Sequence, residues 1–257
     1  MLKVFLDLGA KEDMTDGVMC VAAVVFKPIP YKQFVRPWNR MLRGWGASAF
    51  HATDFYNGAP EFQRDTPEAL RRFKQDVKRI PNLVGTKVQR ILAVSFRPEE
   101  YMQVASQQWI SKFGTSLHSL AVQVCLLEMG WWAEAHCPSE SFAYFMESGD
   151  SDERKVVETV DGMKNDRKTA AVIRVRSFSS IDKGTDRGLE AADFMAWHWN
   201  KYYMDRMRVG QEANPRKDFA ALVSATKNQV YTIFLTGENL KYFFSRVPKE
   251  VLEKWPQ

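Results

Sequence analysis

The sequence predicts an α/β protein in which a mixed β-sheet carries helices on both faces. Two apolar runs, Leu2–Leu8 and Val18–Phe26, flank a charged, turn-prone stretch, as expected for two buried strands joined in a hairpin. Farther along the chain, strand-like runs alternate with helical patterns. Opening antiparallel strands followed by crossover units are typical of a mixed sheet that helices cover on both faces.

The composition indicates one folded domain with a sizeable core. Of the 257 residues, 45% are hydrophobic and 13% aromatic, which argues against a disordered chain. We therefore expect a single domain over residues 1–257, with residues 218–257 forming a C-terminal extension packed on it. The sequence contains no internal repeat and no obvious interdomain linker.

The sequence also predicts a cytoplasmic protein that does not enter a membrane. No apolar run approaches the ~20 residues that span a bilayer, and Lys3 and Asp7 interrupt the beginning of the chain, which argues against a secretory signal. The cysteines Cys20, Cys125 and Cys137 are widely spaced and lack metal-ligand pairing. Such cysteines suit a reducing cytoplasm, and we expect them in the core.

The charge of the chain permits nucleic-acid binding without requiring it. The formal net charge is +5, from 36 basic and 31 acidic residues. Basic side chains gather on the expected helix at Arg71–Arg79 and in the stretch Lys164–Arg176. A cluster of this kind is more often a solvated face than a phosphate track, so nucleic acid is a candidate partner only.

The segment after the hairpin holds one weak and one strong pattern. We expect Tyr31–Leu42 to form a third short strand or an irregular cover, and Met41–Ala49 to form a loop, because glycines and small residues gather there. By contrast, Thr66–Ile80 has the apolar spacing of an amphipathic helix, with Thr66 as its cap and Pro81 just after its end.

The middle of the chain alternates strands and helices. A strand at Val88–Phe96 is followed by a short helix that begins at Pro98. The stretch Thr115–His136 is apolar on nearly all sides and therefore predicts a buried helix. A strand at Ser141–Met146 and a charged helix at Asp152–Met163 come next.

The last third adds one strand, one long helix and a tail. Ala170–Phe178 is expected as a strand, and Ser179–Asp186 as a polar connection to a helix at Arg187–Tyr203. The tail contains a helix, a strand at Val230–Leu235 and a terminal helix around Asn239–Phe244.

The helix Arg187–Tyr203 carries an acid on its apolar side. At the helical period, Asp193 falls on the same side as Leu189, Ala192 and Ala196. A carboxylate on a packed surface loses hydration, and a metal ion, a buried hydrogen bond or a helix N-terminus can each compensate for that loss. The alternative is a structural role, in which Asp193 lies early in its own helix and interacts favourably with the helix dipole.

A second candidate motif lies at His51 and Asp54. These residues are three apart and share one face of a helical turn, which suits a pair of metal ligands or a substrate clamp. The structural alternative is a helix start in which Thr53 or Asp54 is the N-cap and His51 has no role.

Two further acids stand near strand ends. Asp7 lies near the carboxyl end of the first strand, and Glu147 follows the strand at Ser141–Met146. If these ends meet Asp193, the three carboxylates would repel one another unless cations neutralised them. Oxygen ligands of this kind prefer Mg²⁺ or Mn²⁺, and two such ions can drive in-line phosphodiester cleavage.

Four short segments resemble one protein family over most of Leu2–Tyr203. The segments are Phe5-Leu-Asp7, Phe50-His-Ala-Thr-Asp54, Phe145-Met-Glu147 and Gly188-Leu-Glu-Ala-Ala-Asp-Phe-Met-Ala196. Together they resemble the domain-of-unknown-function 3800 family. The resemblance implies a ribonuclease H-like fold, metal-dependent nuclease activity and acidic roles for the four residues Asp7, Asp54, Glu147 and Asp193, with His51 beside them.

One departure from the family pattern leaves more than one function open. The family usually has Glu after the first Asp, whereas Leu8 follows Asp7 here. We predict a metal-dependent nuclease for DNA or RNA, with Asp7, Glu147 and Asp193 as metal ligands. In this prediction His51 and Asp54 position the water or the leaving group. The alternatives are a catalytically degenerate ribonuclease H-like module that binds nucleic acid or a protein partner, and an enzyme acting on another phosphate-containing substrate.

Several other classes of enzyme lack their sequence motifs. The chain has no Walker-type loop, no paired-glycine dinucleotide fingerprint and no serine elbow. Nucleotide-driven, redox and acyl-transfer functions therefore have no support in the sequence.

Overall fold

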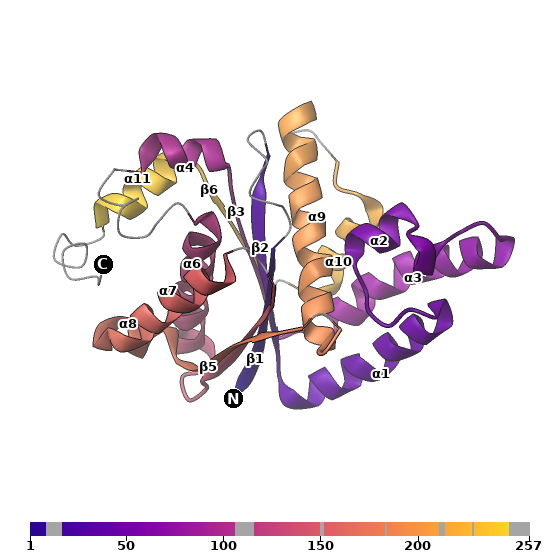
Figure 1. Cartoon of the computed structure of the whole chain (residues 1–257), viewed down its shortest axis with the longest axis horizontal. Coiled ribbons are helices and arrows are strands. Elements are labelled where there is room, and N and C mark those ends of the chain that lie inside the picture. Colours follow the sequence, from indigo (N-terminus) through magenta and orange to yellow (C-terminus); the bar gives the residue numbers. More distant parts are fainter. Residues whose placement is uncertain are drawn as a thin grey trace.

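The structure is a computed structural model of the chain. It describes residues 1–8, 17–105, 116–149, 152–182, 184–210, 214–227 and 229–246. Its centre is a six-stranded mixed sheet with the strand order β5-β4-β1-β2-β3-β6 (Figure 1). The strands are β1 (Leu2–Leu8), β2 (Met19–Phe26), β3 (Arg90–Phe96), β4 (Phe142–Glu147), β5 (Val175–Ile181) and β6 (Val230–Leu235).

The pairing of the strands gives the sheet a ribonuclease H-like topology. β1, β2 and β3 form an antiparallel meander, and β4 and then β5 are added in parallel beside β1. β6 lies parallel to β3 at the other edge. The predicted fold class, a mixed sheet with helices on both faces, is therefore confirmed.

Helices cover both faces of this sheet, as Figure 1 shows. One face carries α6 (Leu117–His136), α7 (Glu153–Asn165) and α8 (Arg167–Ile173). The other face carries α9 (Arg187–Val209), and around α9 lie α1 (Pro28–Trp45), α2 (Ala52–Asn57), α3 (Pro67–Gly85) and α10 (Lys217–Ala225). The shorter elements are η1 (Pro60–Phe62), α4 (Pro98–Val104) and α11 (Gly237–Arg246).

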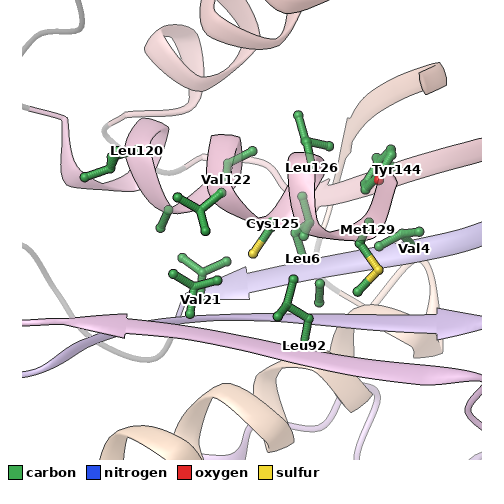
Figure 2. Close-up of a cluster of buried hydrophobic side chains, with 14 of the residues drawn as sticks. Val4, Leu6, Val21, Leu92, Leu120, Val122, Cys125, Leu126, Met129 and Tyr144 are labelled. Carbon is green, nitrogen blue, oxygen red and sulfur yellow. The ribbon is translucent and has the colours of Figure 1, made fainter. Parts of the chain in front are cut away.

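The alternation of side chains along β1 separates the two cores. Val4 and Leu6 belong to the cluster under α6, where Figure 2 shows Leu6 close to Cys125 and Met129 of that helix. Phe5 belongs to the cluster under α9. Since successive side chains of a strand point to opposite faces, Asp7 lies on the α9 face with Phe5.

The segment α1 corrects the prediction for Tyr31–Leu42 and Met41–Ala49. It is a helix that continues to Trp45 and ends at Gly46, whose φ of 72° suits glycine. Its buried residues recur at helical spacing and are Phe34, Trp38, Met41 and Leu42. Prolines concealed this pattern, although Pro28 and Pro30 sit in the first turn, where amide hydrogens need no partner within the helix. Pro37 lies inside the helix.

Two other predicted boundaries were wrong. α3 begins after the Thr66 cap as predicted, but it runs through Pro81 to Gly85. The predicted strand at Ala170–Phe178 is divided between α8 and β5. Asp166 accepts a hydrogen bond from the Thr169 amide at 2.8 Å and so starts a helix in a segment rich in β-branched residues.

The remaining predicted elements are confirmed within a few residues. β3, α4, α6, β4 and α7 lie where the patterns placed them, and the tail contains α10, β6 and α11. α9 begins at Arg187 as predicted but continues to Val209, six residues beyond the predicted end at Tyr203. Along the described part of the chain, no helix is both long and apolar enough to cross a membrane.

Candidate functional site

Two of the predicted acids lie at one edge of the sheet. β1 and β4 are parallel, and Leu6 is in register with Met146, so Asp7 and Glu147 are the next residues on neighbouring strands. The rings of Phe5 and Phe145 stack at 5.2 Å on the α9 face, and side-chain alternation puts the two acids on that same face. Asp7 is 7% exposed and Glu147 is half-buried. The carboxyl ends of β1 and β4 thus carry a pair of carboxylates.

Helix α9 reaches this same edge. Near its start, a Cβ on Gly188 would lie 2.2 Å from the Phe5 ring, so the glycine allows the helix to approach β1 closely. Farther along, Asn200 donates a hydrogen bond to the Val18 carbonyl at 2.5 Å, just before β2 begins. Because these contacts make α9 run in the direction of β1, Asp193 lies at about the level of the strand end that carries Asp7.

The carboxylate of Asp193 caps another helix. Its Oδ2 accepts a hydrogen bond from the Ala52 amide at 2.7 Å, at the start of α2. His51 occupies the N-cap position of α2 without a side-chain cap, and its Nδ1 lies 3.9 Å from the same Oδ2. The predicted N-caps Thr53 and Asp54 were wrong, because Asp193 provides the cap from α9. A helix N-terminus does compensate this carboxylate, but it belongs to α2 and not to α9.

Asp54 lies in the first turn of α2. Its side chain is half-buried, and its backbone carbonyl accepts hydrogen bonds from the amides of Gly58 and Ala59 at 2.9 and 3.0 Å. An acid in the first turn is favourable for the helix dipole. The start of α2 therefore carries His51 and Asp54, and Asp193 contacts the first of these, while Asp7 and Glu147 belong to the strands.

The donor groups of these residues decide whether a divalent cation fits the site. Among the described residues, no three His, Cys, Asp or Glu side chains come together as a group that could hold a metal ion. The metal-ligand roles of Asp7, Glu147 and Asp193 stay a prediction. The strand pair Asp7 and Glu147 does fit the way in which Mg²⁺ is held in phosphate chemistry, by one or two carboxylates together with water and substrate phosphates.

Sequence analysis missed a polar cluster at the other end of α2. The Tyr56 hydroxyl donates to Asp218 Oδ2 at 2.7 Å and lies 3.1 Å from His198 Nε2. Arg216 donates two hydrogen bonds to Asp218, each at 3.2 Å. The guanidinium of Arg216 also lies over the rings of Tyr56 and Trp197, which stack at 4.3 Å. We call Tyr56, Trp197, His198, Arg216 and Asp218 the α2–α10 cluster.

Burial fixes the protonation states in the α2–α10 cluster. Desolvation lowers the pKa of His198 to about 3, so its imidazole is neutral at pH 7. Burial acts to raise the pKa of Asp218, but hydrogen bonds from Arg216 and Tyr56 outweigh it and hold this pKa below its ordinary value. Burial and Asp218 together raise the pKa of Tyr56, so its hydroxyl keeps its proton. The cluster therefore contains one Arg–Asp ion pair and two neutral donors.

A second buried polar group holds α9 to α1. Glu190 is 1% exposed and accepts hydrogen bonds from the Trp38 indole and the Arg187 guanidinium. Arg187 also donates to the Asn39 side chain and the Ser48 carbonyl, at 2.7 and 2.9 Å. Burial raises the pKa of Glu190. In the motif Gly188–Ala196, Glu190 is therefore the structural acid, and Asp193 is the more accessible one.

Comparisons with known proteins bear on the fold alone. No protein-family model matches the chain, and no curated protein matches it in sequence. A crystal structure of a mutant of Bst-RNase HIII is 13% identical, with a TM-score of 0.47, and the match covers 88% of this chain and 70% of that one. Bst-RNase HIII in complex with Mn²⁺ is 16% identical, with a TM-score of 0.45 over 82% of this chain. This chain spans 56% of the length of that structure. The strand order and pairing themselves assign the ribonuclease H-like fold.

Proposed function

We propose that this protein is a divalent-metal-dependent nuclease that hydrolyses phosphodiester bonds of DNA or RNA. The observation that carries the proposal is the pair of carboxylates, Asp7 and Glu147, at the ends of neighbouring parallel strands. α9 runs over the same edge and carries Asp193, which contacts His51. The residues that the family resemblance singles out are thus shared between one sheet edge and the start of α2.

Each residue is assigned a role by its position. Asp7 and Glu147 would hold Mg²⁺ or Mn²⁺, which would neutralise their charges and polarise the phosphate group. Asp193, the third predicted metal ligand, would also orient the His51 imidazole and the start of α2 through its contacts at 3.9 and 2.7 Å. His51, which is partly exposed, would exchange a proton with the water or the leaving oxygen, and Asp54 would position that water.

The test is a cleavage assay on labelled single- and double-stranded DNA and RNA. We expect cleavage with Mn²⁺ or Mg²⁺ and none with EDTA or Ca²⁺, because the looser coordination of Ca²⁺ does not enforce in-line geometry. Asp7→Asn and Glu147→Gln should each lower the rate at least 100-fold, whereas Glu134→Gln, an exposed acid on α6, should cleave normally. Equal residual activity in wild type and Asp7→Asn would indicate a contaminating nuclease and end the proposal.

The same variants give a readout that does not depend on activity. Millimolar Mn²⁺ should raise the Tm of wild type and of Glu134→Gln, because an ion that binds only the folded state stabilises it. The shift should disappear in Asp7→Asn. A wild-type Tm that is insensitive to Mn²⁺ and Mg²⁺ would contradict the assigned metal ligands.

The second candidate is a catalytically degenerate module that binds nucleic acid or a protein partner. The observation that favours it is Leu8, which stands where the resembling family has Glu. Binding of nucleic acid without cleavage under any of these metal conditions would support this alternative.

A further inference from the structure

A groove lies between α3 and α10. The two helices touch where a Cβ on Gly85 would lie 2.7 Å from the Cβ of Ala225. Beside this contact they enclose a solvent-open cavity of about 460 Å³. This volume is in the range of small-ligand sites. Its apolar lining comes from Phe73, Val77 and Ala221, and its basic lining from Lys74, Lys78 and Lys217.

The charge of this α3–α10 groove is positive. Lys74, Lys78 and Lys217 are all exposed. Lys74 and Lys78 are four residues apart and lie on one face of α3, ~6 Å from each other, while Lys217 comes from the opposite wall. Asp218, the acidic residue of the lining, is paired with Arg216 and adds no net negative charge. The groove is therefore complementary to a partner with several anionic groups and an apolar part.

We propose that the α3–α10 groove binds a segment of single-stranded nucleic acid. The phosphates contact the three lysines, and one base enters the apolar part of the groove between Phe73, Val77 and Ala221. A base in a duplex is stacked and paired, so only an unpaired strand can place a base there. This inference names the substrate form of the proposed nuclease, and its biological meaning rests on that function.

The position of α2 links the groove to the candidate site. His51 at its start contacts Asp193, and Tyr56 in its last turn contacts Asp218, which lines the groove. A helix of this length, Ala52–Asn57, spans ~9 Å. A strand that leaves the groove therefore has to cross only about the length of α2 to reach the His51–Asp193 contact.

The basic wall is tested by binding in EDTA, where cleavage cannot interfere. Fluorescence anisotropy with a labelled oligothymidylate of about ten nucleotides compares wild type with Lys74→Gln/Lys78→Gln. The matched control is Lys32→Gln/Arg36→Gln, which removes the same charge at the same spacing from exposed positions of α1. We expect at least a tenfold loss of affinity for the groove variant and less than a twofold change for the control. The slope of log K against log salt should become less steep by about 1.4, since each of the two lost phosphate contacts contributes about −0.7.

The apolar part is tested with Ala221→Trp, which fills the groove without changing its charge. It should weaken oligothymidylate binding about tenfold and leave binding of an abasic oligomer unchanged. If Ala221→Trp lowers the Tm, Phe73→Leu replaces it as the variant that tests the apolar part of the groove. Wild-type affinity in the lysine variant, equal binding of the abasic and normal strands by wild type, or equal displacement by poly-glutamate would each overturn the groove proposal.

The two proposals can fail separately. If wild type binds single strands through the groove but does not cleave them with Mn²⁺, the groove stands and the nuclease fails. If wild type cleaves and the lysine variant binds and cleaves like wild type, the nuclease stands and the groove fails.

Discussion

The two ends of α2 contact α9 in opposite ways. At the start, His51 and Asp193 are 3.9 Å apart, and their side chains are 28% and 18% exposed. In the last turn, Tyr56 belongs to the α2–α10 cluster, where His198 is 1% exposed and Asp218 is held by two other side chains. The α9 partners at the two ends, Asp193 and Trp197, are only one helical turn apart.

This difference separates a buried polar cluster from a contact that solvent can reach. The Asp218–Tyr56–His198 chain of contacts resembles a proton relay, yet His198 and Asp218 are buried and the chain is held in one protonation pattern. Its chemistry is that of a buried network that joins three helices. The His51–Asp193 contact is looser and open to solvent, so a ligand can reach it.

The largest expected effect comes from breaking the buried end. Asp218→Ala should lower the free energy of unfolding by about 2–3 kcal/mol, because it leaves the Tyr56 hydroxyl and the Arg216 guanidinium without their acceptor. The estimate is moderated because the Arg216 side chain is 41% exposed and can regain water. Urea unfolding measures the change, with Lys217→Ala expected within 0.5 kcal/mol of wild type. A loss below 0.5 kcal/mol for Asp218→Ala would show that the cluster does not hold α10 in place.

The next effect is a pH dependence that originates from His198. Its pKa is about 3 in the folded protein, against 6.5 ordinarily. Between these two pH values the unfolded chain therefore binds a proton at His198 that the folded protein does not bind. The stabilisation by the neutral ring is complete above pH 6.5 and is lost as the pH falls toward 3. Between pH 6.5 and 5, wild type should lose about 2 kcal/mol that His198→Gln does not lose. Parallel stability curves for the two proteins over this interval would refute the assignment.

The smallest effect is expected at the exposed end, where function is the more sensitive readout. Asp193→Ala should cost about 1 kcal/mol, since it removes the N-cap of α2, whereas Asp193→Asn should stay within 0.5 kcal/mol because Asn caps equally well. Cleavage should fall in both variants, because the charge is lost in both. Full cleavage activity in Asp193→Asn would show that Asp193 caps α2 and has no role in cleavage.

Sequence reasoning reached most of the fold because the hydrophobic patterns were strong. The hairpin of β1 and β2, the amphipathic face of α3 and the apolar helix α6 each follow from period and composition. The sequence-based prediction of an element was wrong where local signals conflicted with tertiary packing. In α1, Pro37 masked a helical stripe that includes Phe34 and Trp38, and in α8 the N-cap Asp166 prevailed over β-branched neighbours.

The candidate site was predictable only for residues that violate a local pattern. Asp7 interrupts an apolar strand and Glu147 ends one, so both were recognised. The partner of Asp193 is a backbone amide on a distant helix, and no sequence spacing indicates such a contact. The α2–α10 cluster is built from residues far apart in the sequence, on α2, on α9 and at the start of α10. The one local trace of it is Arg216 two positions before Asp218, an arrangement too frequent to be informative.

The parallel addition of β6 to β3 has a consequence for the order of folding. The β1–β2–β3 meander is closed by contacts within the first 96 residues, whereas β6 returns from Val230–Leu235. Closing so long a loop is entropically costly and slow compared with forming the meander. Until β6 and α10 arrive, β3 presents an unpaired edge that can recruit another chain. A chain in which β6 has not yet docked is thus predisposed to aggregate through β3, and the segment that carries α10 and β6 completes both the pairing of β3 and the second wall of the groove.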